Sequence, residues 1–217
     1  MNILSVPTGP LSVNTYIVFT DEAAKKGGDC VVIDPANSKK VLDEMAKYKL
    51  HCSHILLTHG HFDHIIGVAG LKEHENATVM IHSLDAAALS DSSVNLAMIS
   101  GALVRPCEVD IPLKDNDRFT AAGMDFRVIH TPGHTRGCVC FVMEDEKVIF
   151  SGDTLFRLSV GRTDFPGSST EQLYESILYR LFTLQGDYRV LPGHMRETTL
   201  DFERKHNPFM RNGGLDY

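Results

Sequence analysis

The sequence has no long apolar run and no recognisable leader segment. No apolar stretch approaches the roughly 18 residues that a membrane-spanning helix needs. The N-terminal stretch MNILSVPTGPLSVN lacks both the basic start and the apolar run of a secretory signal peptide. We therefore expect a cytoplasmic protein with no membrane partner.

Positive charge is also in short supply. Lys and Arg number 21 against 28 Asp and Glu, so the formal net charge is −7 and the pI is about 5.8. Proteins that bind nucleic acid through its phosphate backbone normally present a basic face. The balance argues against a nucleic-acid partner. The apolar fraction of 43% is ordinary and predicts a globular chain with a sizeable core.

The cysteines form no recognisable disulfide framework or thiolate metal site. Their number is odd, no C-x-x-C pair occurs, and they are scattered among apolar stretches. We expect buried free thiols in a reducing compartment. Cys138 and Cys140 alternate in a strand-like run, so they should share one face of a strand. The five are Cys30, Cys52, Cys107, Cys138 and Cys140.

No linker or low-complexity segment divides the chain, so we predict one α/β domain over residues 1–217. Short β-branched runs alternate with helical stretches, and the early chain is mainly strands, which favours sheet packed on sheet with helices outside. The expected strands are residues 3–6, 14–20, 30–34, 54–58, 77–82, 125–130, 138–143, 147–151 and 188–192. The expected helices are residues 38–48, 65–75, 83–90, 170–183 and 197–206, with Ser169 or Thr170 capping the fourth.

One short stretch concentrates metal-ligand side chains. Residues 56–67 read LLTHGHFDHIIG, and His59, His61, Asp63 and His64 fall within six positions between apolar runs. Burying so many polar groups is costly unless something compensates their desolvation, and a metal ion would do so. Imidazole nitrogen and carboxylate oxygen suit a divalent transition metal.

Polar residues follow three further predicted strands directly. His134, Asp153 and His194 each come after an apolar run and a glycine, which allows close backbone approach at a tight turn. Ligand sites in α/β proteins lie at strand ends, so distant segments can deliver these side chains to one edge. With the first cluster they make seven candidates, which suits two metals. The remaining histidines are expected to be exposed, locally bonded or structural: His51, His54, His74, His82, His130 and His206.

The motifs in their order resemble the metallo-β-lactamase superfamily, and within it the glyoxalase II-like hydrolases. The matching stretches are THGHFDH (58–64), PGHT (132–135), SGDTLF (151–156) and PGH (192–194), preceded by VVIDPA (31–36). The resemblance spans most of the chain. It implies a four-layer αβ/βα sandwich with two mixed sheets, and two metals in a cleft at the edge of the paired sheets.

The resemblance also implies a role for each ligand. His59, His61 and His134 would hold the first metal, and Asp153 would bridge to the second.

The second metal would be held by Asp63, His64 and His194, and Asp63 also receives a catalytic role from the resemblance. Asp34 would brace the histidine loop by hydrogen bonds, as residues behind metal ligands usually do. The alternative for Asp34 is a simple turn residue before Pro35.

A dinuclear centre predicts hydrolysis of a small anionic thiolester. A hydroxide bridging the two metals would attack a carbonyl that one metal polarises. Two divalent ions, two carboxylates and one hydroxide leave a local charge of about +1 despite the acidic chain. True β-lactamases of the superfamily lack an aspartate like Asp153, which favours a hydrolase of the glyoxalase II type. Zinc is the expected metal, and iron or manganese also accept these ligands.

Substrate contacts are expected from the segment after Asp153. Arg162 and Arg157 are its cationic groups, and a guanidinium can hold a carboxylate through two hydrogen bonds. Arg162 is favoured because GRTDF (161–165) resembles a stretch that contacts the thiol substrate in relatives. The alternative for Arg162 is a salt bridge that only braces the loop. The chain lacks the helical C-terminal domain of longer glyoxalase II enzymes, which leaves the identity of the thiol open.

Two rival functions share the same ligands. A persulfide dioxygenase of this fold would bind one iron through His59, His134 and Asp153, leaving positions open for substrate and oxygen. Lactone and phosphodiester hydrolysis are other chemistries of the superfamily. A metal-binding module without catalysis is the second rival, but structural zinc sites are closed and this ligand set leaves room for water. The sequence gives no oligomeric state.

Overall fold

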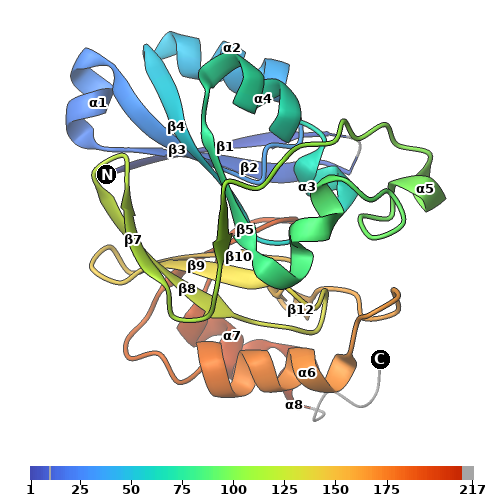
Figure 1. Ribbon diagram of the computed structural model, residues 1–217. Helices are drawn as coiled ribbons and strands as arrows, with labels where there is room; N and C mark the ends of the chain where they lie inside the picture. The colour runs from blue at the N-terminus through green and yellow to red at the C-terminus, as the bar shows by residue number, and fades with distance from the viewer. Residues whose placement is uncertain (10, 212–217) are drawn as a thin grey trace. The chain divides into compact units, whose positions relative to one another are not determined.

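The computed structural model describes residues 1–9 and 11–211, and the chain divides into two compact units. The first unit is Met1–Leu113 with Phe119–Asp125, and the second is Lys114–Arg118 with Phe126–Tyr217. A single domain over residues 1–217 stays a prediction. Two mixed sheets are present: the first lies in the first unit, and most of the second lies in the second unit (Figure 1).

The first unit holds a six-stranded sheet in the order β1-β2-β3-β4-β5-β6. β1, β2 and β3 pair antiparallel, whereas β3, β4, β5 and β6 run parallel. Parallel neighbours have their carboxyl ends at the same edge, so the residues that follow β3, β4 and β5 meet there. The strands are β1 (Asn2–Thr8), β2 (Val13–Phe19), β3 (Gly28–Ile33), β4 (Leu50–Leu57), β5 (Thr78–His82) and β6 (Ile111–Leu113).

Helices connect the parallel strands and cover the sheet. Figure 1 shows α2 and α4 lying together above the strands, and their buried side chains Val41, Met45 and Leu71 join the same apolar core as the strand residues Val32 and Ile55. The helices are α1 (Asp21–Lys26), α2 (Ser38–Lys47), α3 (Phe62–Ile65), α4 (Val68–Glu75), the 3₁₀ helix η1 (Ser83–Leu89) and α5 (Ala97–Ser100).

The second sheet runs in the order β14-β13-β10-β9-β8-β7. β8, β9 and β10 pair antiparallel in turn and β13 lies parallel to β10, so β8, β10 and β13 all point the same way. Their carboxyl ends therefore meet at one edge. The strands are β7 (Arg118–Ala121), β8 (Met124–His130), β9 (Val139–Met143), β10 (Val148–Gly152), β13 (Arg189–Pro192) and β14 (Thr198–Thr199), with a separate hairpin of β11 (Leu155–Phe156) and β12 (Ser159–Val160).

Three helices and one π-helical segment complete the second unit. Leu173, Ile177 and Leu181 pack into one core with Val142 and Val190 of the strands, which is the apolar stripe that their spacing predicts. Ser169 caps the start of α6 by accepting from the Gln172 N–H, as expected. The segments are α6 (Thr170–Glu175), the π-helical η2 (Ser176–Leu181), α7 (Leu200–His206) and α8 (Pro208–Arg211).

All nine predicted strands are present, but three predicted helices are changed. The predicted helix 65–75 begins only at Val68, because the Gly67 N–H donates to the Pro35 carbonyl instead of continuing the helical pattern, and the separate helix α3 ends at Ile65. Residues 83–90 form a 3₁₀ helix. The predicted helix 170–183 turns π-helical at Ser176, whose hydroxyl donates to the Pro132 carbonyl.

Two further differences concern short elements. The helix predicted from residue 197 starts at Leu200, after the short strand β14, with Thr199 as its cap. The sequence patterns missed α1, α3, α5, α8 and the short strands β6, β7, β11, β12 and β14. In the part of the chain that the structure describes, no helix has the length and apolar character needed to cross a membrane.

Candidate metal centre

The histidine loop of the first unit lies where β4 ends. His59 follows β4 after Thr58, and His61 directly precedes the four-residue helix α3 that carries Asp63 and His64. All four side chains are buried. The rings of His59 and His61 meet edge to face at 4.8 Å, and those of His59 and His64 lie 4.2 Å apart. The first unit thus gathers its four predicted ligands, which we call the first cluster.

Asp34 holds the histidine loop through hydrogen bonds. It directly follows β3, next to β4, and its φ of 50° turns the chain sharply there. Its carboxylate accepts from the Thr58 N–H at 2.8 Å, from the Thr58 hydroxyl at 2.6 Å and from His64 Nδ1 at 3.0 Å. These hydrogen bonds connect Asp34 to both ends of the histidine loop, as expected for a residue that braces it.

The same contacts fix which ring nitrogen carries the proton. A carboxylate only accepts, so His64 Nδ1 carries a proton, and Nε2 is the acceptor nitrogen of the neutral ring. The Thr58 hydroxyl already donates to Asp34, so it accepts from His59 Nδ1 at 3.1 Å and leaves His59 Nε2 with its lone pair. Metal-binding histidines are usually oriented in this way. Ligand atoms of Asp34, His59 and His64 lie within 4.8 Å of one another.

Two buried residues that the sequence did not single out also hold the loop. Asp85, on η1 after β5, accepts from the Gly60 N–H at 3.0 Å. Asn95 supplies the carbonyl that accepts from the Phe62 N–H at 2.8 Å, at the start of α3. Asp85 could have been suspected because it follows a third parallel strand. Nothing in the local pattern marks Asn95.

The second unit gathers His134, Asp153 and His194, which we call the second cluster. They follow β8, β10 and β13, whose carboxyl ends share one edge. Asp153 Oδ2 lies 3.6 Å from His134 Nε2 and 3.5 Å from His194 Nε2. In the first cluster, His64 Nε2 lies 3.7 Å from Asp63 Oδ2.

These separations fit ligands that share a cation. They are longer than the roughly 2.7–3.2 Å of an N–H···O hydrogen bond. Two ligands at about 2.1 Å from a tetrahedral ion lie about 3.4 Å apart. The donor set, neutral imidazole with carboxylate, is also the one that divalent transition metals prefer. Each cluster by itself therefore suits a divalent metal.

His134 is held by the chain that follows Asp153. Its Nδ1 donates to the Arg162 carbonyl at 2.7 Å, which leaves Nε2 toward Asp153. Gly161 passes so close that a Cβ there would lie 1.9 Å from the Asp153 carbonyl oxygen, so only glycine fits. Gly133, with φ of 139°, is pressed in the same way against the backbone of Leu173 on α6.

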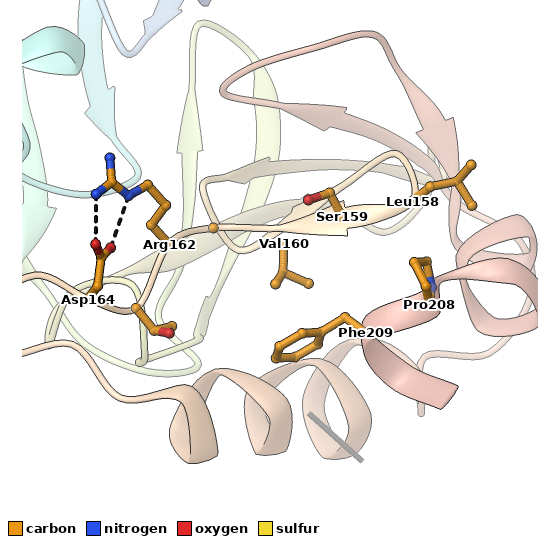
Figure 2. A pocket seen from close by; sticks show the side chains of 9 residues that line it. Leu158, Ser159, Val160, Arg162, Asp164, Pro208 and Phe209 are labelled. Atoms are coloured by element: carbon orange, nitrogen blue, oxygen red, sulfur yellow. Dashed lines mark hydrogen bonds and ion pairs between the residues drawn. The ribbon is translucent and has the colours of Figure 1, made fainter. Parts of the chain in front are cut away.

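The two predicted substrate arginines both have partners in the second unit. Arg162 is largely exposed and forms a two-point ion pair with Asp164 at 2.9 and 2.7 Å (Figure 2). The hydrogen bond from Arg162 lowers the pKa of Asp164 below its ordinary value. The Arg157 guanidinium lies 4.4 Å from the ring centroid of Phe202. A substrate role for either arginine stays a prediction.

A groove of about 430 Å³ lies beside this segment in the second unit. Figure 2 shows Val160 facing Phe209, with the ion pair of Arg162 and Asp164 toward the other end. Such a volume is typical of small-molecule sites. Residues 158–164 with Pro208 and Phe209 line it.

The other histidines and the cysteines have local roles. His51, His54, His74 and His130 hydrogen-bond to nearby residues, His82 accepts from the Leu84 N–H, and His206 stacks on Phe202. All five cysteines are free thiols, as predicted, and four of them are buried.

Comparison with known proteins places the chain in a family. The family model of the metallo-beta-lactamase superfamily matches residues 8–194, which include every predicted metal ligand. An uncharacterized protein of Aquifex aeolicus is 37% identical, covering 96% of this chain and 97% of its own. Hydroxyacylglutathione hydrolase GloC of Haemophilus influenzae is 30% identical, covering 98% and 99%.

Solved structures agree with the fold. The BLEG-1 B3 metallo-beta-lactamase has a TM-score of 0.90 at 32% identity, covering 96% of this chain and 99% of its own. The structure of TTHA1623 in a di-iron-bound form has a TM-score of 0.84 at 38% identity, and the match covers 95% of this chain and 99% of TTHA1623. The structure of ETHE1 from Myxococcus xanthus has a TM-score of 0.78 at 27% identity, and the match covers 98% of this chain and 85% of ETHE1. The predicted α/β class with two mixed sheets is confirmed, and the chain belongs to the metallo-β-lactamase superfamily and groups with its metallo-hydrolases.

Proposed function

We propose that this chain is a dinuclear metal-dependent hydrolase of a small anionic thiolester, of the glyoxalase II type. The observation that carries the proposal is the orientation of the buried histidines. His59, His64 and His134 each give Nδ1 to a protein acceptor and keep Nε2 for a ligand. Metal-binding histidines usually donate their other ring N–H to a protein acceptor in this way.

In this proposal both clusters serve one centre. His59, His61 and His134 bind the first metal, and Asp153 bridges it to the second. The carboxylate of Asp153 suits that role because it lies at similar distances from two different histidines.

The second metal is bound by Asp63, His64 and His194. Bound divalent metals lower the pKa of coordinated water and polarise a carbonyl, which is the chemistry that ester cleavage needs. Asp63 is the proposed catalytic carboxylate, and its burial beside His64 keeps it oriented. The backbone and Asp34 hold the donors in place before any substrate arrives, so little reorganisation accompanies the reaction.

The substrate side is proposed to be the groove of the second unit. Its apolar end at Val160 and Phe209 suits the organic part of the thiol, and Arg162 suits a carboxylate. Because the ion pair with Asp164 is exposed, exchanging one carboxylate for another costs little. GloC is nearly the same length as this chain, which supports glutathione as the thiol without a further helical domain.

A second candidate is the mononuclear iron persulfide dioxygenase. It would use His59, His134 and Asp153, and the likeness to ETHE1 over 98% of the chain favours it. The distinguishing residues are Asp63, His64 and His194, which a one-iron site does not need. Asp63 and His64 are buried and His194 is half-buried beside Asp153, and this placement favours the dinuclear hydrolase.

A substrate panel tests the proposal. Purified full-length protein is assayed with a 2-hydroxyacyl-glutathione thiolester, a thiolester of another small thiol, a β-lactam, and glutathione persulfide in an oxygen electrode. We expect thiolester hydrolysis that a chelator abolishes and added zinc or iron restores. Oxygen consumption with persulfide and no thiolester cleavage would favour the dioxygenase. Cleavage of the β-lactam alone would point to the activity named for BLEG-1.

A further inference from the structure

The hairpin that follows Asp153 contains a strained turn. β11 and β12 pair antiparallel and are joined by the two residues Arg157 and Leu158. Leu158 has a φ of 56°, at the second central position of the turn, where glycine or asparagine is usual. A branched, bulky residue in the left-handed region persists only where its surroundings hold it there.

Helix α7 and the residue after it contact each residue of this turn in order. Phe202 stacks under the Arg157 guanidinium, and Glu203 Oε2 accepts from the Leu158 N–H at 2.9 Å. Asn207 Nδ2 donates to the next carbonyl, that of Ser159, at 3.1 Å. Three successive residues of the hairpin are therefore held by one helix and its C-cap, Arg157 through its side chain and Leu158 and Ser159 through their backbone.

Glu203 is an unusual group to find in this place. Its side chain is 0% exposed, and carboxylates are rarely so buried without a cationic partner. Its oxygens instead accept from three neutral donors: the Leu158 N–H, Asn207 Nδ2 at 2.9 Å and the Thr198 hydroxyl at 2.6 Å. Such a cluster is costly to bury and restricts the position of everything it contacts.

The hairpin leads straight into the contacts that orient the second cluster. Gly161 follows β12 and passes against the Asp153 carbonyl, and Arg162 supplies the carbonyl that accepts from His134 Nδ1. If the turn relaxed, Gly161 and Arg162 would shift together. The His134 ring would then lose the hydrogen bond that aims Nε2 at Asp153.

We propose that Glu203, with Asn207, is a positioning residue that clamps the β11–β12 hairpin and thereby orients His134. The clamp also gives Arg157 a role, through its stacking on Phe202, that differs from substrate binding. Only the last step, from an oriented His134 to metal binding, rests on the proposed function.

The wild-type protein provides the first test, by amide hydrogen exchange measured with NMR on the full chain. The Leu158 amide lies in a half-exposed two-residue turn, where an unclamped amide exchanges quickly. The clamp predicts exchange within about tenfold of the β10 amides of Ile149 and Phe150. Exchange at the rate of an open turn would overturn the proposal without any variant.

Matched variants at one position provide the second test. Glu203→Met keeps the apolar bulk but removes the acceptor, whereas Glu203→Gln keeps an acceptor for Leu158. We expect the Met variant to exchange about 100-fold faster over residues 155–162 and to lose the slowly exchanging Nδ1 proton signal of His134. The Gln variant should keep both.

The control is Thr198→Val, which removes the hydrogen bond to Glu203 Oε1 and leaves both contacts to Oε2. It should lower stability but leave the exchange rate and the His134 signal unchanged. The clamp would be overturned if Glu203→Met kept the slow amide exchange and the His134 signal. It would also be overturned if Thr198→Val lost both to the same extent as Glu203→Met. Absence of thiolester activity alongside the expected exchange results would instead overturn only the proposed function.

Discussion

Asp34 illustrates how one carboxylate can set the chemistry of several neighbours. It accepts directly from His64 Nδ1 and, through the Thr58 hydroxyl, sets the tautomer of His59. It is buried at the end of β3 and makes no contribution to a surface ion pair. The left-handed backbone of Asp34 and its hydrogen bonds have one explanation if Asp34 orients His59 and His64 so that each offers Nε2 to a metal.

Asp34→Asn should therefore weaken zinc binding by about 10–100-fold, because the amide nitrogen would face either the Thr58 N–H or, in the other orientation, both the Thr58 hydroxyl and His64 Nδ1. Competition with a coloured chelator measures the affinity. Asp29→Asn is the matched control, since Asp29 lies exposed at the other end of the same strand. Equal affinities for the two variants would show that Asp34 is only a turn residue.

Arg162 and its partner can be separated by a pair of charge-removing variants. If Arg162 binds a substrate carboxylate, Arg162→Gln should raise KM about tenfold or more with little change in kcat. Asp164→Asn releases Arg162 from its ion pair and should leave KM unchanged or lower. Steady-state kinetics with the preferred thiolester decide the matter, and a similar rise in KM for both variants would identify a loop brace.

The buried thiol of Cys140 predicts how stability depends on alkaline pH. Burial raises the pKa of Cys140 to about 11, whereas an unfolded thiol titrates near 8.5. A raised folded pKa gives stability that is complete below the unfolded pKa and is lost as the pH rises to 11. The free energy of unfolding should fall by roughly 3 kcal/mol at most over that window. Urea titrations of wild type and Cys140→Ala should diverge there, and parallel curves would contradict the shift.

At the scale of elements, strand direction explains why the ligands gather. β8, β10 and β13 run the same way, so His134, Asp153 and His194 reach one edge although 60 residues of sequence separate the first from the last. In the first unit, β3, β4 and β5 deliver Asp34, the histidine loop and Asp85 to one edge in the same manner.

Gly133→Ala tests how tightly α6 is set against the loop that carries His134. An added Cβ would lie 2.4 Å from the Leu173 backbone, so we expect a loss of at least about 3 kcal/mol in the free energy of unfolding. Gly186→Ala is the control: its φ is also positive, but nothing lies within 4 Å, and it should cost about 1–2 kcal/mol. Urea denaturation compares them, and equal losses would contradict close packing at Gly133.

Sequence patterns predicted the strands better than the helices. The strands are buried β-branched runs such as CVVID and KVIFS, which are distinctive locally. The helix ends depend on distant groups: the Pro35 carbonyl interrupts one helix at Gly67, and the Pro132 carbonyl draws Ser176 into a π-helical turn. The turn that joins the short strands β11 and β12 donates a hydrogen bond to Glu203 of α7, and no local pattern reveals this contact.

The same distinction applies to the site. The ligand types are apparent from their spacing because histidine and aspartate rarely crowd together in an apolar context. The groups that orient them are not, because Thr58, Asp85 and the Arg162 carbonyl act through hydrogen bonds across the fold. Backbone acceptors in particular carry no signature in a sequence.

At the scale of the whole molecule, an acidic chain carries a set of candidate ligands for positive ions. The net charge of −7 argues against polyanionic partners, whereas a centre with two divalent metals attracts a small anion locally. The family match covers both clusters, and the relatives compared here share nearly the whole length of the chain. The central proposal is that all seven candidate ligands serve one dinuclear centre.

Metal content of the purified protein tests that claim most directly. Mass spectrometry on protein prepared without added metal should find about two transition-metal ions per chain, and His64→Ala or His194→Ala should reduce this to about one. A single iron per chain that is unchanged when His64, Asp63 or His194 is replaced would contradict the dinuclear centre. That result would favour the one-iron dioxygenase.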